Sequence, residues 1–226
     1  LDQNEVAKLV DPADIKRFRD RALTPERPVT RGTAENPETF FTHREACNAA
    51  YDKIPEVVEH YMQELGKITG REHHLFDYYG AADAERVIIL MGSATEAARE
   101  AIDYLTAKGE KVGMVSVHLY RPFSVKHLLA AVPQSCKKIA VLDRTKEPGA
   151  EGEPLYLDVK SAFYDVENKP VIVGGRYGLG SNDTTPAKII AVFNNLSLDE
   201  PKNHFTVGIV DDVTFTSLPE VEEIPM

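Results

Sequence analysis

Strand-sized apolar segments alternate with segments of helical periodicity between residues 86 and 196. Such alternation implies right-handed β-α-β crossovers, so we expect an α/β fold: a three-layer α/β/α sandwich around a mostly parallel sheet. A further short apolar and aromatic segment is expected to form an edge strand at Leu75–Tyr79. The four main strands are expected at Arg86–Met91, Lys111–Leu119, Lys138–Leu142 and Pro170–Val173.

Start and stop signals place helices before and between these strands. Helices are expected at Pro55–Gly70, Ser93–Lys108, Ser124–Val132, Glu153–Tyr164 and Thr185–Leu196. Thr185 is expected to be an N-cap, and Gly70 a C-cap. Ser93 and Glu96 have the spacing of a capping box. The same strand–Gly–Ser–helix junction is also typical of phosphate sites, because free amides and the helix dipole favour an anion.

The two ends of the chain differ from this core in composition. Asp11 and Pro12 can begin a short helix that would carry Ile15, Phe18 and Leu23 inward. Prolines and a glycine follow, so we expect residues 1–50 to be an extended interdomain arm lying over another surface. Residues 51–200 are expected to form the α/β core domain. Residues 201–226 are expected to be a strand-like tail, at residues 204–215, followed by an acidic linker toward a next domain.

Composition narrows the class of protein. The chain has 226 residues, a hydrophobic content of 42% and a formal net charge of −10. A negative charge of this size argues against a general nucleic-acid or anionic-membrane binder, and the longest apolar runs are too short to span a membrane. The first residue is Leu1, so we expect a piece of a longer polypeptide.

The cysteines and histidines do not form a recognisable metal or nucleophile pattern. Cys47 and Cys136 are far apart and are expected to be reduced thiols, which suits a cytoplasmic protein. Two cysteines cannot hold an iron–sulfur cluster. Cys47 follows His43, but an incidental thiol is the preferred interpretation over a nucleophile. The adjacent histidines His73 and His74 have no third metal ligand at suitable spacing, so we expect them to be solvated surface residues rather than metal ligands.

Basic residues follow the ends of three predicted strands. Arg121, Arg144, Lys146 and Arg176 should meet, with Ser93, at the carboxyl edge of the sheet, where ligands bind in folds of this kind. They could clamp phosphate or carboxylate, for instance in an anion- or coenzyme A-binding module. Alternatively, they pair with Asp143, Glu147 or acids of a neighbouring domain, and this packing role is the preferred hypothesis.

The glycine-rich loop at residues 174–181 has the wrong spacing for a dinucleotide site. Its glycines favour positive φ and close backbone approach, so we expect Gly178 or Gly180 to adopt positive φ. We find no set of nucleophile, base and orienting residue, and no group of metal ligands. On its residues alone, the chain is expected to bind or support rather than to catalyse.

Six long motifs resemble those of pyruvate:ferredoxin (flavodoxin) oxidoreductases, in the same order along the chain. They are Arg31–Pro37, Leu75–Arg86, Leu119–Phe123, Val141–Gly149, Gly175–Ser181 and His204–Ile209. The resemblance covers nearly the whole chain. One local departure is Val210, where an acidic residue would be expected.

The resemblance implies a large multidomain enzyme, usually a homodimer. Such an enzyme decarboxylates pyruvate oxidatively with thiamine diphosphate and magnesium, forms acetyl-CoA from coenzyme A, and passes electrons through [4Fe-4S] clusters to ferredoxin or flavodoxin. This chain is similar to its second domain, which resembles the C-terminal domain of transketolase. No catalytic, cofactor-binding or metal-binding residue of the family maps onto it. Its implied partners are therefore the other domains of the same polypeptide.

Overall fold

The computed structural model describes residues 1–30, 32 and 34–224. Of the residues discussed above, Arg31 in the first motif and Met226 at the end of the predicted linker lie outside the described residues, as do residues 33 and 225. The chain divides into two compact units, Leu1–His74 and Leu75–Met226. Residue 50, the predicted end of the arm, lies within the first unit.

The second unit contains one six-stranded sheet in the order β1-β3-β2-β4-β5-β6. The edge strand β1 runs antiparallel to β3, and the other neighbouring pairs are parallel. The mostly parallel α/β sheet and its short edge strand are thus confirmed. The strands are β1 (Phe76–Gly80), β2 (Arg86–Leu90), β3 (Val112–Val117), β4 (Lys138–Asp143), β5 (Val171–Arg176) and β6 (Phe205–Thr206).

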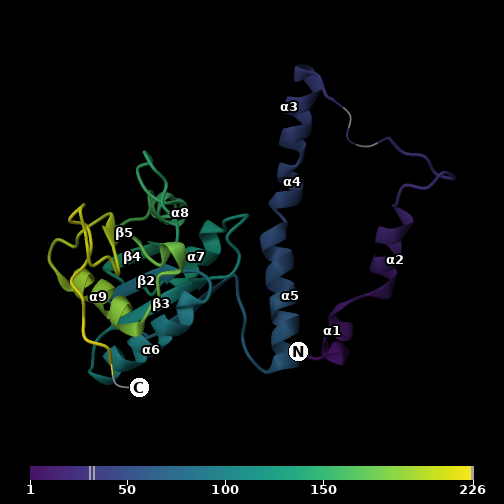
Figure 1. Cartoon of the computed structure of the whole chain (residues 1–226). Coiled ribbons are helices and arrows are strands. Elements are labelled where there is room, and N and C mark those ends of the chain that lie inside the picture. The colour runs from purple at the N-terminus through teal and green to yellow at the C-terminus, as the bar shows by residue number, and fades with distance from the viewer. Residues whose placement is uncertain (31, 33, 225–226) are drawn as a thin grey trace. The chain divides into compact units, whose positions relative to one another are not determined.

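Helices cover both faces of this sheet (Figure 1). On one face, α6 (Ala94–Ala107) and α9 (Pro186–Ser197) pack against each other and against the central strands. On the other face lie α7 (Val125–Ala131) and α8 (Pro154–Ala162). Parallel strands need such double coverage because their two faces are both apolar.

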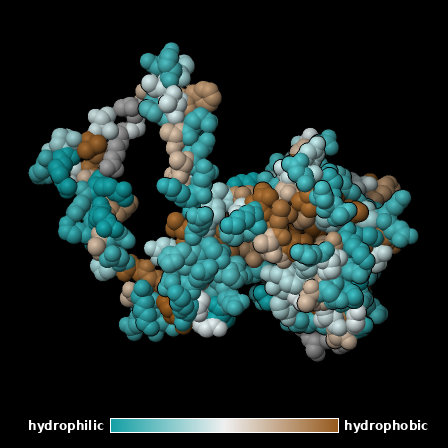
Figure 2. Space-filling view, turned by 180° about the vertical axis from the view of Figure 1, so that it is seen from behind, coloured by the Kyte–Doolittle hydropathy of each residue, from teal (hydrophilic) through white to brown (hydrophobic). Residues whose placement is uncertain are grey.

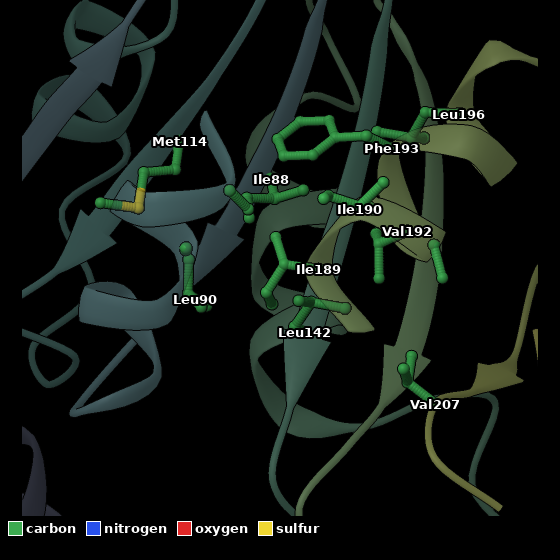
Figure 3. Close-up of a cluster of buried hydrophobic side chains, with 14 of the residues drawn as sticks. Ile88, Leu90, Met114, Leu142, Ile189, Ile190, Val192, Phe193, Leu196 and Val207 are labelled. Atoms are coloured by element: carbon green, nitrogen blue, oxygen red, sulfur yellow. The ribbon is translucent and has the colours of Figure 1, made fainter. Parts of the chain in front are cut away.

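The core between the sheet, α6 and α9 is built from aliphatic side chains and one large aromatic ring. Ile88 and Leu90 of β2 meet Ile189 and Phe193 of α9 there, and all four are nearly or wholly inaccessible to solvent (Figure 3). The residues alternating with them on β2, Val87 and residue 89, are also fully buried. The continuous apolar run of this strand therefore reflects burial on both faces.

The first unit contains α1 (Gln3–Leu9), α2 (Pro12–Asp20), α3 (Pro37–Ala46), α4 (Asn48–Tyr51) and α5 (Ile54–Thr69). Two predicted helix ends are confirmed: Asp11 caps α2 by accepting from the amide of Ala13, and Gly70 ends α5 in the left-handed conformation. No residue of these five helices is buried.

One prediction for this unit is wrong. Ile15, Phe18 and Leu23 were expected to point inward, but they are 40%, 70% and 62% exposed. The reason is that the unit as described has no core to receive them. Figure 2 shows hydrophobic residues, in brown, at the surface of both units.

The predicted strand at residues 204–215 is also mostly wrong, since only Phe205–Thr206 pairs with the sheet. Gly208 has a φ of +83°, which turns the chain away from the sheet. Beyond it, the Asp212 carboxylate accepts hydrogen bonds from the amides of Thr214 (3.0 Å) and Ser217 (2.6 Å). These local hydrogen bonds stabilise a turn, so the segment does not continue to pair with the sheet as a longer strand.

The loop after β5 gives a prediction about backbone strain. Gly178 and Gly180 both have positive φ, +64° and +62°, as expected from the sequence. A Cβ on Gly180 would meet no atom within 4 Å, so valine there tests the backbone alone. We expect Gly180→Val to lower the free energy of unfolding by about 1–3 kcal/mol. The control is Leu179→Val at the exposed neighbouring position. An unchanged denaturation midpoint in a Gly178→Val, Gly180→Val double variant would contradict the interpretation that positive φ requires glycine at these positions.

Candidate functional site

The carboxyl ends of β2, β4 and β5 meet at one edge of the sheet. The chain leaves β2 through α6 to β3 on one side, and returns through α7 to β4 on the other side. The edge between β2 and β4 is therefore a switch point, where α/β folds open a crevice. A cavity of about 630 Å³ lies there. Its lining includes Ser93, Tyr120, Asp143, Arg144 and Tyr177.

Asp143 is the last residue of β4 and is almost completely buried. Its two carboxylate oxygens accept hydrogen bonds from the amides of Leu155 (3.0 Å) and Tyr156 (3.1 Å). These amides belong to the first turn of α8, where a helix has no internal partners for them. Burial raises the pKa of Asp143, and the two amide hydrogen bonds oppose that rise. The carboxylate thus fixes the start of α8, and among the described residues it forms no ion pair with Arg144.

Glu153, just before α8, is the acid that two of the predicted basic residues share. Its side chain is 2% exposed. It lies 3.4 Å from Nη1 of Arg176 and 3.7 Å from Nζ of Lys146. Arg176 also donates through Nη2 to the carbonyl oxygen of His204, at 2.8 Å. Lys146 and Arg176 line a second, smaller cavity of about 290 Å³, beside the turn at residues 207–209.

Arg121 is held at a third place. Its Nη2 lies 2.7 Å from an oxygen of Asp158 on α8, and its guanidinium stacks on Tyr120, 3.9 Å from the ring centroid. Burial and the bond to Asp158 raise the pKa of Tyr120 to about 12, so its hydroxyl stays protonated at neutral pH. Arg121 does not line either cavity described above.

Ser93 and Arg144 come together at the large cavity. Arg144 donates from Nε to the carbonyl oxygen of Gly178, at 2.8 Å. The predicted capping box at Ser93 is wrong: Ser93 already has helical φ and ψ, and its side chain makes no cap hydrogen bond. An N-cap needs extended backbone to reach the following amides. The hydroxyl of Thr95 instead donates to the carbonyl oxygen of Gly92, at 2.8 Å.

The predicted basic edge is therefore three separate environments rather than one cluster. Sequence reasoning named the cations but missed their partners, Glu153 and Asp158. The sequence instead predicts Asp143 and Glu147 as partners, because they flank Arg144. The predicted helix could have identified these two partners. Glu153 lies at its start and Asp158 in its middle, and the helix must cover this edge of the sheet.

Neither cysteine is placed to hold a metal or cluster. Cys47 is exposed, whereas burial raises the pKa of the Cys136 thiol to about 12. Within the described residues there is no group of three or more His, Cys, Asp or Glu side chains that could hold a metal ion. The residues present thus do not fit the iron–sulfur clusters that the family resemblance implies for the whole enzyme, and we assign no step to such a group here. No helix among those described is long and apolar enough to cross a membrane.

Two families match the chain. The family described as "Pyruvate:ferredoxin oxidoreductase core domain II" matches residues 84–189. The family described as "Pyruvate flavodoxin/ferredoxin oxidoreductase, thiamine diP-bdg" matches residues 1–63. The first of these matches lies within the second compact unit, and the second lies within the first unit.

Curated relatives match nearly the whole chain. A pyruvate-flavodoxin oxidoreductase of Enterobacter agglomerans is 58% identical over 97% of this chain and 19% of its own length. A pyruvate:ferredoxin oxidoreductase of Moorella thermoacetica is 53% identical over 99% of this chain and 19% of its own length. The chain therefore spans about a fifth of these relatives. A solved 2-oxoglutarate:ferredoxin oxidoreductase of Magnetococcus marinus aligns at 19% identity and a TM-score of 0.40, over 74% of this chain and 24% of that one.

The role of Asp143 can be tested by removing its carboxylate. Asp143→Ala leaves two buried amides of α8 without acceptors, so we expect the free energy of unfolding to fall by about 1–3 kcal/mol. The matched control is Glu147→Ala, four residues away and exposed, which should change it by less than about 0.5 kcal/mol. Equal effects of the two variants in denaturant unfolding would contradict the assignment.

The raised pKa of Asp143 also predicts a pH dependence. The folded chain binds the proton more tightly than the unfolded chain does, so this group stabilises the fold most below its unfolded pKa. That stabilisation is lost as the pH rises through the folded pKa. Between about pH 7 and about pH 4, we expect wild type to gain stability relative to Asp143→Asn. Unfolding curves of both proteins across this range give the difference. A difference that is constant, or that favours the variant at low pH, would show the direction to be wrong.

Proposed function

Because the chain belongs to the pyruvate:ferredoxin (flavodoxin) oxidoreductase family as one segment of a longer protein, we propose that it is a non-catalytic interdomain segment of such an enzyme. The observation that carries the proposal is the match of core domain II to the compact α/β unit. Identity of 58% over 97% of the chain supports it. The α/β unit would shape the subunit and pack against neighbouring domains.

The contacts of the edge residues support a structural role. The charges of Arg121 and Arg176 are paired with Asp158 and Glu153, within the same unit. Both acids lie at or in α8, so these pairs link the exits of β3 and β5 to one helix. The Arg176–Glu153 pair is buried, so it positions the two elements that it joins and leaves little charge for chemistry. The Arg121–Asp158 pair is more exposed and contributes less.

For the whole enzyme we propose oxidative decarboxylation of pyruvate to acetyl-CoA, with electrons passed to ferredoxin or flavodoxin. The printed names of the relatives support pyruvate as the substrate and ferredoxin or flavodoxin as the electron partner. The family matched by residues 1–63 supports thiamine diphosphate, which would supply the carbanion stabilisation for decarboxylation. Magnesium, coenzyme A, [4Fe-4S] clusters, a homodimer and a cytoplasmic location belong to the same proposal, and rest on the family resemblance.

A chimera tests this role. Residues 1–226 would replace the matching segment of the Enterobacter agglomerans relative, and pyruvate-dependent flavodoxin reduction would be measured. We expect the chimera to be active, because the exchanged segments are 58% identical. The purified chain by itself should show neither activity nor iron–sulfur absorbance. Activity of the chain alone would overturn the proposal, as would a folded chimera without activity that carries its full complement of cofactors.

A further inference from the structure

The smaller cavity beside the end of β5 has a mostly apolar wall. Tyr177, Leu179, Val207 and Ile209 line it, together with two glycines. Its volume of about 290 Å³ lies just below the range of small-molecule sites, so it suits a single side chain better than a whole ligand. Leu179 and Ile209 are 44% and 45% exposed, so the apolar wall continues onto the outer surface. A cavity with such a rim is typical of a contact between proteins.

The charged residues that line this cavity are both basic. They are Lys146 and Arg176, and no carboxylate of the described residues belongs to the lining. Glu153 lies 3.4 Å from Arg176 and 3.7 Å from Nζ of Lys146, so one carboxylate serves two cations. Lys146 otherwise donates only to the neutral carbonyl oxygen of Glu147, at 3.2 Å, and its side chain is 47% exposed. Lys146 therefore carries the surplus positive charge, and a complementary partner would place a carboxylate beside it.

The chain presents an apolar side chain and a carboxylate directly next to the cavity. Val210 and Asp211 follow Ile209, and both are exposed, Val210 by 83%. Val210 is also the position at which the sequence shows an unexpected apolar residue. Within the part of the chain that the structure describes, the Asp211 carboxylate has no hydrogen-bond or ion-pair partner. The two residues thus supply the chemistry that the cavity and Lys146 lack.

The segment that carries these two residues is held in place by hydrogen bonds. The Asp212 carboxylate accepts from the amides of Thr214 and Ser217, so it is engaged where Asp211 is not. The amide of Thr206 in β6 donates to the carbonyl oxygen of Thr216, at 3.0 Å, which ties the far end of the turn to the sheet. A turn that is already ordered loses little conformational freedom when it binds.

We propose that two copies of this chain associate through this surface about a two-fold axis. Val210 of each copy enters the smaller cavity of the other, and Asp211 lies against Lys146 of the partner subunit. In a two-fold interface the same patch serves both copies, so it must carry both the cavity and the residues that fill it. The cavity is complete only with these residues of the second copy.

The proposed contact lies within the α/β unit, so it does not rest on the interdomain role that the chimera tests. It also goes beyond the homodimer proposed for the whole enzyme, to which no surface is assigned. The net charge of −10 on each copy opposes association. We therefore expect a weak dimer of the isolated chain, with a Kd of about 10–100 μM.

Analytical ultracentrifugation of the whole chain, at concentrations on either side of this Kd, tests the contact. Val210→Asp should weaken the dimer by about tenfold or more, because it places a carboxylate in an apolar cavity. The matched control is Leu198→Asp, the same kind of change at a half-exposed leucine beside Lys138, at the opposite edge of the sheet. This variant should dimerise like wild type.

A charge exchange tests the ion pair. Lys146→Glu and Asp211→Lys should each weaken the dimer by about tenfold, and the double variant should recover to within about threefold of wild type. Melting midpoints establish that each variant is folded, and Val210→Asp remains decisive if Lys146→Glu does not fold. The proposal is overturned if the chain stays monomeric at all concentrations, if Val210→Asp and Leu198→Asp have equal effects, or if the folded double variant dimerises no better than the single variants.

Discussion

The need to bury both faces of the parallel strands determines the rest of the second unit. β2 and β4 lie in the middle of the sheet, and beyond their first residues, Arg86 and Lys138, their side chains are buried on both faces. Helices must therefore cross above and below, with α6 and α9 on one face and α7 and α8 on the other (Figure 1). Because every parallel strand then ends at the same edge, the loops that follow the strands lie close together whether or not they share a function.

At that edge, α8 and the residue before it supply most of the acidic partners of the basic side chains. Asp143 holds its first turn to the end of β4, while Glu153 and Asp158 receive Arg176 and Arg121 from the exits of β5 and β3. Three loops are thereby tied to one helix. Arg144 is the exception, because its only described hydrogen bond is to a backbone carbonyl. Arg144, which lines the large cavity, therefore differs from the other basic residues of this edge, whose charges are paired with carboxylates of the same unit.

Local sequence patterns predicted an element well where its apolar periodicity and its capping residues indicated the same bounds. The strand predicted at Arg86–Met91 is β2, Arg86–Leu90, and the predicted Thr185 cap of α9 is confirmed. The pairing of the edge cations was not, because it depends on α8 lying over the edge, a tertiary contact between residues many positions apart. Ser93 failed for a related reason: the turn at Gly92 had already given it helical backbone, so its hydroxyl could not cap. Asp212 formed local hydrogen bonds that shortened the expected final strand.

Residues 75–224 carry the stability of the chain, since the five helices before them bury no residue. Native-state hydrogen exchange of the whole chain measures this directly, amide by amide. We expect amides of β2 and β4 to exchange only through global unfolding, and those of α5 to exchange orders of magnitude faster. Protection of α5 equal to that of β4 would contradict it.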